Sequence, residues 1–190
     1  ELWPSRQDTR YVQEFLDGCW MAPEVRLVGI NIAASSRWPS KNWPKEHIAK
    51  LCDLLASKNI RVFLTGLEKD KELAKSILKG AKSKPIDFTG KTNILQLAAF
   101  IKKCSVFVTP DSAPMHVAAA VKTPFVALFG PTDPLRHLPP SGHCRVIDLK
   151  LECAPCYKGE CPIKKHVCMK NITVDQVFQS IESLMTKVQL

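Results

Sequence analysis

The chain has 190 residues, of which 45% are hydrophobic, so it can bury a core of ordinary size and is not disordered throughout. No apolar run approaches the ~20 residues that span a bilayer, and the first residues lack the regions of a signal peptide, so we expect a soluble, cytoplasmic domain. The net charge of +9 favours acidic partners, among them nucleotide phosphates, a phosphorylated glycolipid, an anionic membrane surface and nucleic acid, and does not choose between them.

The first residues are predicted to precede the main domain. Residues 1–23 contain one helical stretch, near Tyr11 to Leu16, and otherwise resemble an interdomain connector. Residues 24–190 are predicted to form one domain. Because the sequence begins without Met, at a segment that resembles a connector, we expect a fragment or a processed product of a longer protein.

Short β-branched runs alternate with longer helical patterns from Arg26 onward, which is typical of a parallel sheet covered by helices. Five strands are predicted, at Arg26–Ile32, Val62–Thr65, Ile86–Phe88, Val106–Val108 and Phe125–Phe129. The last is almost uniformly apolar, as expected for a strand buried on both faces. The expected fold class is therefore α/β, a Rossmann-like parallel sheet with helices on both faces.

Two predicted helices begin at capping pairs, in which a side chain at the helix start exchanges hydrogen bonds with a residue three positions later. Asn93 and Gln96 begin the helix after the third strand, and Thr173 and Gln176 begin the final helix, residues 173–188. The apolar positions of the final helix recur at helical spacing and are predicted to be buried. They are Val177, Ile181, Leu184 and Val188.

Prolines mark the first turn of two further helices. Pro44 begins the helix after the first strand, and Pro114 begins a helix that runs to Val121, with Asp111 or Ser112 placed to cap it. After Gly130 the chain is predicted to be a loop rich in Pro and Gly until the final helix. Four lysines follow one helical pattern, and a solvated helix face is favoured for them. They are Lys69, Lys71, Lys75 and Lys79.

Polar side chains follow four of the predicted strands where each strand ends. Ligands of open α/β sheets bind at this carboxyl edge, so we expect these side chains to lie together. They are Ser35, Ser36 and Lys41 after the first strand, Glu68 after the second, Asp111, Ser112 and His116 after the fourth, and Thr132 after the fifth.

The segment from Asp111 to His116 places unpaired backbone N–H groups at a helix N-terminus, which favours a phosphate site. Ser112 can donate a hydroxyl hydrogen bond, and His116 faces the same end of the helix one turn later. A capped helix start with a surface histidine explains the same residues equally well. Local sequence does not separate the two interpretations.

Lys41 and Glu68 suit the other parts of a nucleotide. Lys41 supplies a positive charge for a diphosphate, although a lysine in a polar loop is usually only solvated. Glu68 follows Gly66 and can accept hydrogen bonds from ribose hydroxyls, as acidic residues do in related sheets. A first-turn helix acid stabilised by the helix dipole is an equally good interpretation of Glu68.

The segment Thr89–Thr92 reads Thr-Gly-Lys-Thr and resembles the end of a phosphate-binding P-loop. That motif also requires a glycine separated by four residues from its Gly-Lys pair, and this position, five before Gly90, holds Pro85. The sequence therefore excludes a P-loop NTPase.

Four late cysteines, Cys153, Cys156, Cys161 and Cys168, have His166 nearby. The first pair has the spacing of zinc ligands, but the other gaps do not repeat it. Without a secretion signal, reduced thiols are the default. We expect no metal, and we predict that these cysteines lie near one another, away from the active site, and brace the link to the final helix.

Ordered blocks of the sequence carry a resemblance to a known family. They are Lys41–Pro44, Leu64–Gly66, Phe88–Thr92, Asp111–His116, Thr123–Pro124, Ala127–Thr132 and the cysteines at 153, 156, 161 and 168. In these blocks the chain resembles the ADP-heptose:lipopolysaccharide heptosyltransferases, glycosyltransferase family 9, from about Val25 to Val188. The cysteine pattern is more similar to the second inner-core heptosyltransferase than to the first.

The resemblance implies a GT-B architecture, in which two Rossmann-like domains face each other, and this chain resembles the C-terminal, donor-binding domain alone. It implies inverting transfer without a metal or cofactor, with the general base on an N-terminal domain, so no catalytic residue and no activity are expected in this fragment by itself. The implied partners are ADP-heptose, the lipopolysaccharide core acceptor and that N-terminal domain. Nucleic acid is not among them, whereas peripheral contact with the inner face of the cytoplasmic membrane suits the basic charge.

Site residues carry over by motif position. The resemblance implies that Lys41 contacts phosphate, that Glu68 contacts ribose, and that four residues contact the diphosphate and heptose, namely Asp111, Ser112, Ala113 and His116. Ser35, Ser36 and Thr132 are further candidates. The family usually has glycine at position 113, so the methyl group of Ala113 either crowds the donor or is tolerated where the local φ is negative.

Two alternatives stay open. Nothing in the sequence reads the heptose, so a family member that uses another sugar or acceptor fits as well. A non-catalytic nucleotide-binding or zinc-binding module is the second alternative, supported by the cysteines and by the absence of a second domain.

Overall fold

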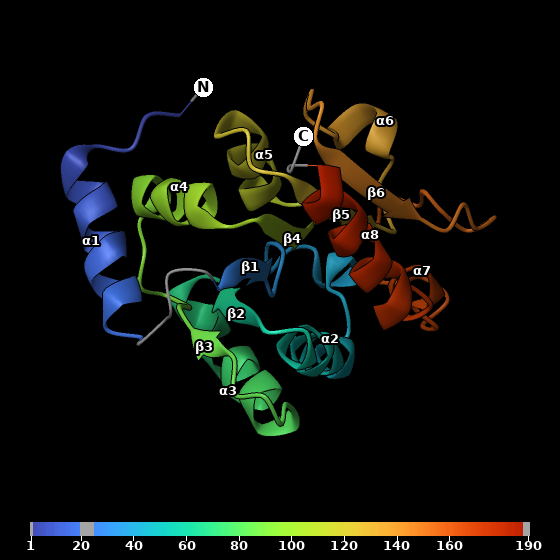
Figure 1. The fold of residues 1–190 in the computed structure, drawn as a ribbon. Helices are drawn as coiled ribbons and strands as arrows, with labels where there is room; N and C mark the ends of the chain where they lie inside the picture. The colour runs from blue at the N-terminus through green and yellow to red at the C-terminus, as the bar shows by residue number, and fades with distance from the viewer. Residues whose placement is uncertain (1, 20–24, 188–190) are drawn as a thin grey trace.

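Six parallel strands form one sheet in the computed structural model, which describes residues 2–19 and 25–187 (Figure 1). The strand order is β3-β2-β1-β4-β5-β6, so the order reverses between β1 and β4. This arrangement confirms the predicted α/β class and its parallel Rossmann-like sheet. The strands are β1 (Arg26–Asn31), β2 (Ile60–Thr65), β3 (Ile86–Asp87), β4 (Val106–Pro110), β5 (Phe125–Phe129) and β6 (Cys144–Asp148).

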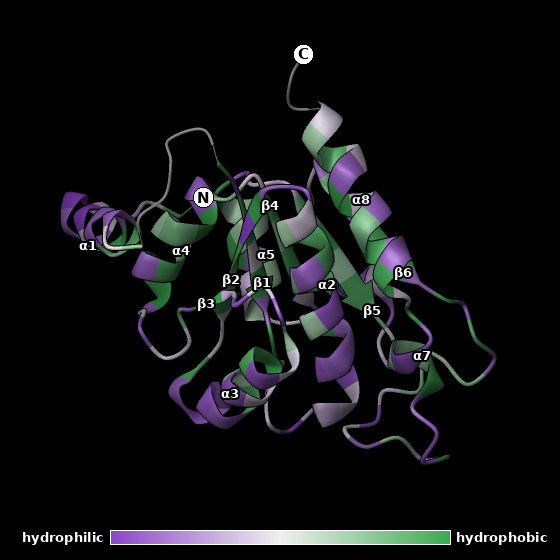
Figure 2. Cartoon of the chain, turned by 60° about the horizontal axis from the view of Figure 1, so that its bottom comes forward, coloured by the Kyte–Doolittle hydropathy of each residue, from purple (hydrophilic) through white to green (hydrophobic). Residues whose placement is uncertain are grey.

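Helices cover both faces of the sheet. One face carries α1 (Arg6–Asp17), α4 (Ile94–Lys103) and α5 (Ala113–Ala120), and the other carries α2 (Lys45–Ser57), α3 (Lys71–Gly80) and α8 (Val174–Lys187). Four short segments lie in the loops. They are η1 (Pro39–Lys41), η2 (Glu68–Asp70), α6 (Pro134–His137) and α7 (Val167–Lys170). In Figure 2, β5 has hydrophobic colouring, whereas hydrophilic residues dominate the visible side of α3.

The two faces of the sheet bury different side chains. Phenylalanines fill the face under α1 and α4, where Phe63, Phe88 and Phe100 are each 0% exposed. The ring of Phe15, from α1, stacks on Phe88 with 4.2 Å between ring centroids. The opposite face buries aliphatic side chains of α2, α3 and α8, such as Leu51. Each fully buried Leu or Phe contributes about 1.5–3 kcal/mol relative to an exposed one, so both helix layers are needed for stability.

The two predicted capping pairs are present. Asn93 Oδ1 accepts from the Gln96 backbone N–H at 2.9 Å, and Gln96 Oε1 accepts from the Asn93 N–H at 3.0 Å. Thr173 and Gln176 exchange the same two contacts at 3.2 and 2.9 Å. The predicted end of the final helix at Val188 lies outside the described residues, as do residues 20–23 of the predicted connector.

The sequence interpretation missed β6, since it assigned everything between Gly130 and the final helix to loop. Strand β6 pairs with β5 alone, and the side chains of Cys144, Arg145 and Val146 are half-buried or exposed. An edge strand of mixed polarity shows no apolar run, so it is visible only from its pairing. The helices α6 and α7 were missed for a different reason, since each has only 4 residues, too few to show helical periodicity.

The helix after β4 also differs at its start. Ser112 occupies the N-cap position of α5, but no side chain caps this helix. The Ser112 hydroxyl instead donates to the Pro110 carbonyl at 3.1 Å, and the Asp111 side chain points elsewhere. The predicted cap by Asp111 or Ser112 is therefore wrong.

Candidate functional site

A cavity of about 540 Å³ opens at the carboxyl edge of the sheet, between the ends of β1 and β4. This is the point at which the strand order reverses, where ligands of open α/β sheets bind. Its volume falls in the range of small-molecule sites. Loops after β1, β2 and β4 line it, as the positions of the polar residues predicted. The predicted site residues that line the cavity are Ser35, Lys41, Asp111, Ser112, Ala113 and His116.

Lys41 enters this cavity from η1 as half of an ion pair. Its Nζ lies 2.7 Å from Asp111 Oδ2, and the two side chains are only 14% and 7% exposed. The hydroxyl of Thr132 donates to the same carboxylate oxygen at 2.7 Å. The Lys41 Nζ also lies 4.8 Å from the centroid of the Trp38 ring. Lys41 is therefore a fixed, mostly buried cation and not a solvated surface lysine.

The N-terminus of α5 forms the other wall of the polar part of the cavity. No side chain caps this helix, Pro114 has no N–H, and the Met115 N–H donates to the Ser112 carbonyl at 3.0 Å. The Ala113 N–H and the positive end of the helix dipole are therefore available to an anion. Asn31 holds the approach to the helix, since its Nδ2 donates to Ser112 Oγ at 3.1 Å. Ala113 belongs to the helix and has no positive φ, so its methyl group causes no backbone strain.

Glu68 lies next to the cavity but does not line it. Its carboxylate is 70% exposed and lies 2.5 Å from Lys71 Nζ. A Cβ atom at Gly90 would lie 2.4 Å from Glu68 Oε2, so the turn at Gly90 packs against this side chain. Ser36 and Thr132 are likewise outside the cavity lining, and Thr132 reaches the site only through Asp111.

Several lining residues were missed by the sequence interpretation, which considered mainly the polar side chains of the loops after the strands. Leu67 and Ile94 line the cavity although they are 61% and 52% exposed. Exposed apolar side chains beside a polar site suit the flat face of a nucleotide base. Trp38 and Asn31 were missed too, although both lie within or directly beside the first predicted strand and its loop.

Comparison with known proteins assigns this arrangement to a family. The family model described as glycosyltransferase family 9 (heptosyltransferase) matches residues 4–167. The chain belongs to glycosyltransferase family 9. It is 33% identical over 166 residues to lipooligosaccharide heptosyltransferase 2 of Campylobacter jejuni. The aligned segment covers 85% of this chain and 52% of the relative.

Two solved structures of the family share its fold. The glycosyltransferase of family 9 from Veillonella parvula has a TM-score of 0.85 and 28% identity, covering 98% of this chain and 53% of its own. The ADP-heptose heptosyltransferase II of Escherichia coli has a TM-score of 0.81 and 28% identity, covering 100% and 54%. The chain thus spans about half the length of the curated relatives it matches.

The Cys-rich loop, residues 153–168, gathers its four cysteines around one cavity of about 20 Å³, together with His166. The predicted proximity of the four residues is therefore confirmed. All four are free thiols, and burial, assisted by the three neighbouring cysteines, raises the pKa of Cys168. Among the described residues, no group of three or more His, Cys, Asp or Glu is arranged to hold a metal ion.

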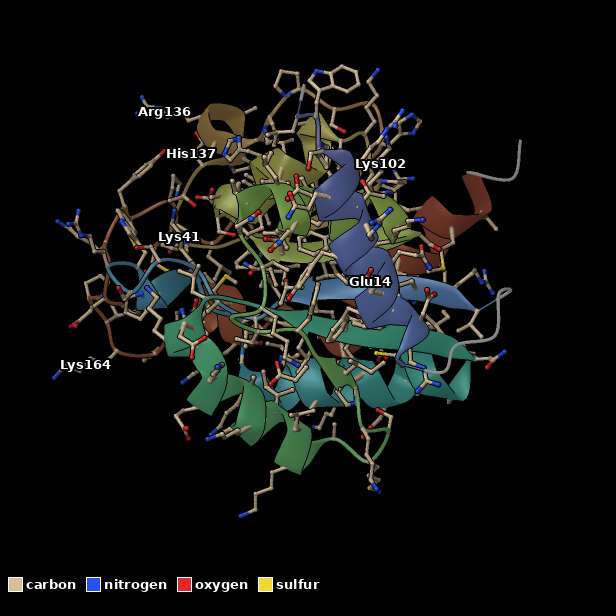
Figure 3. The ribbon with its side chains drawn as sticks, turned by 90° about the vertical axis from the view of Figure 1, so that its left-hand side faces the viewer. Glu14, Lys41, Lys102, Arg136, His137 and Lys164 are labelled. Atoms are coloured by element: carbon tan, nitrogen blue, oxygen red, sulfur yellow. The ribbon has the colours of Figure 1, made fainter. Side chains whose placement is uncertain are left out.

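The position expected for the Cys-rich loop, away from the sheet edge, is wrong. Its Gly159 carbonyl accepts from the Ser40 N–H at 3.0 Å, directly beside Lys41. The loop is also joined to the segment after β5, because the Tyr157 N–H donates to the Pro131 carbonyl at 2.8 Å. Figure 3 shows Lys41 and Lys164 on the same side of the molecule, with Lys164 projecting outward.

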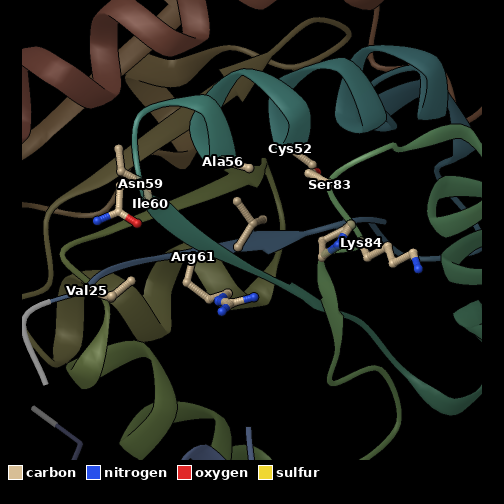
Figure 4. Close-up of a pocket in the computed structure, with 10 residues that line it drawn as sticks. Val25, Cys52, Ala56, Asn59, Ile60, Arg61, Ser83 and Lys84 are labelled. Carbon is tan, nitrogen blue, oxygen red and sulfur yellow. The ribbon is translucent and has the colours of Figure 1, made fainter. Parts of the chain in front are cut away.

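A second cavity, of about 220 Å³, lies at the amino ends of the strands (Figure 4). Asn59, Ile60 and Arg61 line it at the start of β2. Cys52 in its wall is buried, which raises the pKa of that thiol to about 12 and keeps it protonated. Among the described residues, no helix begins at this cavity, so it lacks the uncapped helix N-terminus that the cavity at the carboxyl edge has.

Within the described part of the chain, no helix has both the length and the apolar composition needed to cross a membrane.

Proposed function

We propose that the chain is the C-terminal, donor-binding half of a GT-B heptosyltransferase that transfers heptose from ADP-heptose to the lipopolysaccharide inner core. The observation that carries the proposal is the cavity at the β1–β4 reversal, where a buried lysine and an uncapped helix N-terminus converge in a member of glycosyltransferase family 9. The relatives and the E. coli structure support the sugar and the nucleotide, since their names specify heptosyltransferase and ADP-heptose.

In this proposal the diphosphate lies between Lys41 and the N-terminus of α5. Both groups present positive charge to the same space, and the single negative charge of Asp111 offsets that of Lys41 but not the dipole of α5. Ser112 and His116 lie at the same helix end and are our candidates for further contacts to the diphosphate or the heptose.

The nucleoside is proposed to lie over the loop after β2. Leu67 and Ile94 offer apolar surface for the adenine ring. Glu68 is proposed to break its ion pair with Lys71 and to accept hydrogen bonds from the ribose hydroxyls. An exposed ion pair of this kind contributes at most about 1 kcal/mol, so a ribose contact can replace it at little cost.

The chemistry of this half is stabilisation of the leaving group. Negative charge develops on ADP as the bond to the sugar breaks, and Lys41 and the α5 dipole are placed to stabilise that charge. Neither contact needs a metal ion or a cofactor. The general base that deprotonates the acceptor hydroxyl is proposed to come from an N-terminal domain, with the lipid-linked acceptor held near the inner face of the cytoplasmic membrane.

Titration calorimetry of the chain with ADP, UDP and adenosine tests the proposal. We expect ADP to bind more tightly than UDP, because Leu67 and Ile94 offer apolar surface that the larger adenine ring covers better than uracil, whereas both nucleotides carry the same ribose. We expect ADP to bind more tightly than adenosine, because only ADP engages Lys41 and α5. If ADP and adenosine bind equally, the cavity is not a diphosphate site, and the proposed function is wrong.

A further inference from the structure

The Cys-rich loop contacts the segment that carries Lys41 through one buried serine. Ser40, only 5% exposed, donates its backbone N–H to the Gly159 carbonyl at 3.0 Å and its hydroxyl to the Lys158 carbonyl at 2.6 Å. Its own carbonyl accepts from His166 Nε2. Each polar atom of Ser40 therefore has a partner on the loop, and Ser40 is the residue immediately before Lys41.

Close backbone packing strengthens this contact. A Cβ atom at Gly159 would lie 2.4 Å from the Arg37 carbonyl oxygen, so no side chain fits at this position. The neighbouring Cys161 holds His166, since its Sγ accepts from the His166 backbone N–H at 3.2 Å. The loop thus fixes both ends of the segment from Arg37 to Lys41, one by contact with Gly159 and the other through His166.

The loop also supports the other half of the ion pair. The Tyr157 N–H donates to the Pro131 carbonyl at 2.8 Å, and the next residue, Thr132, donates to Asp111 Oδ2 at 2.7 Å. Lys41 therefore directly follows a residue that the loop holds, and Asp111 accepts from Thr132, which directly follows another such residue. A lysine on a flexible turn loses conformational entropy when it binds a phosphate, and this loss weakens binding. On a turn that is already fixed, most of this entropy is lost during folding, so less is lost on binding.

We propose that the Cys-rich loop is a positioning element of the donor site, with Ser40 as the positioning residue that aims Lys41 at the diphosphate. The inference rests on the proposed function, because it needs a diphosphate in the cavity. It assigns the cysteines a role in nucleotide affinity through the backbone of η1, and no contact of their own with the nucleotide.

Calorimetry of the 190-residue chain with ADP and with adenosine tests this role. Ser40→Ala removes the hydroxyl bond to Lys158, and we expect it to weaken ADP binding about fivefold to tenfold and to leave adenosine binding unchanged. Ser57→Ala is the matched control, because its hydroxyl donates to Leu54 at the far end of α2, and it should change neither affinity.

A double-variant comparison separates positioning from general stability. In a Lys41→Ala background, Ser40→Ala should have no further effect on ADP binding, because Ser40 acts only through Lys41. Gly159→Ala forces the loop away from Arg37 and should weaken ADP binding at least as much as Ser40→Ala. Circular dichroism confirms that each variant is folded, and the Ser40 variant alone suffices if Gly159→Ala does not fold.

The results distinguish the two proposals. Unchanged ADP binding in folded Ser40→Ala, or equal weakening of ADP and adenosine, would overturn the positioning role while the proposed function stands. A further loss of ADP affinity in the Lys41→Ala background would also overturn it. A wild-type chain that binds adenosine and ADP equally would refute the proposed function and, with it, this inference.

Discussion

At the residue scale, Lys41 is distinguished from the other lysines by its burial. Its ammonium group lies 2.7 Å from the Asp111 carboxylate, with both side chains largely removed from water. Removing one partner of such a pair leaves the other charge without compensation, which costs more than the pair itself contributes. Variants at Lys41 therefore change stability and affinity together, and the two effects must be measured separately.

We expect Lys41→Ala to weaken ADP binding by roughly tenfold to a hundredfold, because a charged contact to a diphosphate is worth about 1.5–3 kcal/mol. The free energy of unfolding should fall by about 1–3 kcal/mol, since the Asp111 carboxylate keeps only Thr132. Calorimetry and urea denaturation measure the two quantities.

The double variant Lys41→Ala/Asp111→Asn is the control, and it should regain part of the lost stability but not the ADP affinity of the wild type. Unchanged ADP affinity in folded Lys41→Ala would show that Lys41 does not contact the diphosphate.

Ala113 is a second prediction at this scale. The residue lies in the first turn of α5 without a positive φ, so glycine is not needed there for backbone conformation. We expect Ala113→Gly to change ADP affinity less than twofold and to lower the free energy of unfolding by about 0.5–1 kcal/mol, the usual cost of glycine in a helix. A marked gain in ADP affinity would instead show that the methyl group crowds the phosphates.

At the scale of elements, the turn at Thr89–Thr92 has a structural role that its likeness to a P-loop concealed. Gly90 has φ of 71°, a conformation that favours glycine, and its Cα faces the Glu68 side chain. The turn is held because the Gly90 N–H donates to the Gly66 carbonyl at 2.9 Å. It therefore sets the position of the loop after β2, which we propose contacts the nucleoside.

We expect Gly90→Ala to lower the free energy of unfolding by about 1–2 kcal/mol, because alanine is strained at this φ and its methyl group would meet Glu68. Gly142→Ala is the matched control, since nothing lies within 4 Å of its added methyl group, and it should be near neutral. Thermal denaturation compares the two. Equal stability of the two variants would argue against strain at Gly90.

At the scale of the whole molecule, the chain has one Rossmann-like sheet and covers 52% of the length of its Campylobacter jejuni relative. In our proposal the donor is held here, while the acceptor and the general base belong to a second domain. The predicted division of the chain into residues 1–23 and 24–190 remains a prediction, although α1 packs firmly on the sheet through Val12 and Leu16.

We expect the 190-residue chain to bind ADP but to transfer no heptose to a heptose-deficient lipopolysaccharide. The reason is that the proposed general base and most of the acceptor site lie outside it. A radiolabelled transfer assay measures this, with a full-length member of the family as the positive control. Transfer by the chain alone, above the level of a Lys41→Ala control, would contradict the division of labour.

The sequence by itself determined the features that depend on near neighbours. Apolar periodicity located five of the strands, the residues three positions apart identified the capping pairs of α4 and α8, and the alternation of strands and helices placed the polar loops at one edge. The motifs shared with the family lie in the same loops and so predicted a site at the same carboxyl edge of the sheet. These features can be recognised in the sequence because each depends on residues only a few positions apart.

Only the tertiary structure decided the contacts that join distant segments. The pair of Lys41 with Asp111 spans 70 positions, and the contact of Ser40 with Lys158 spans 118. Strand β6 forms by pairing with the edge of β5, and Ser112 does not cap α5 because its hydroxyl bonds Asn31 Nδ2 and the Pro110 carbonyl instead. Such contacts depend on how helices and loops pack around the sheet, and no local pattern of residues encodes that geometry.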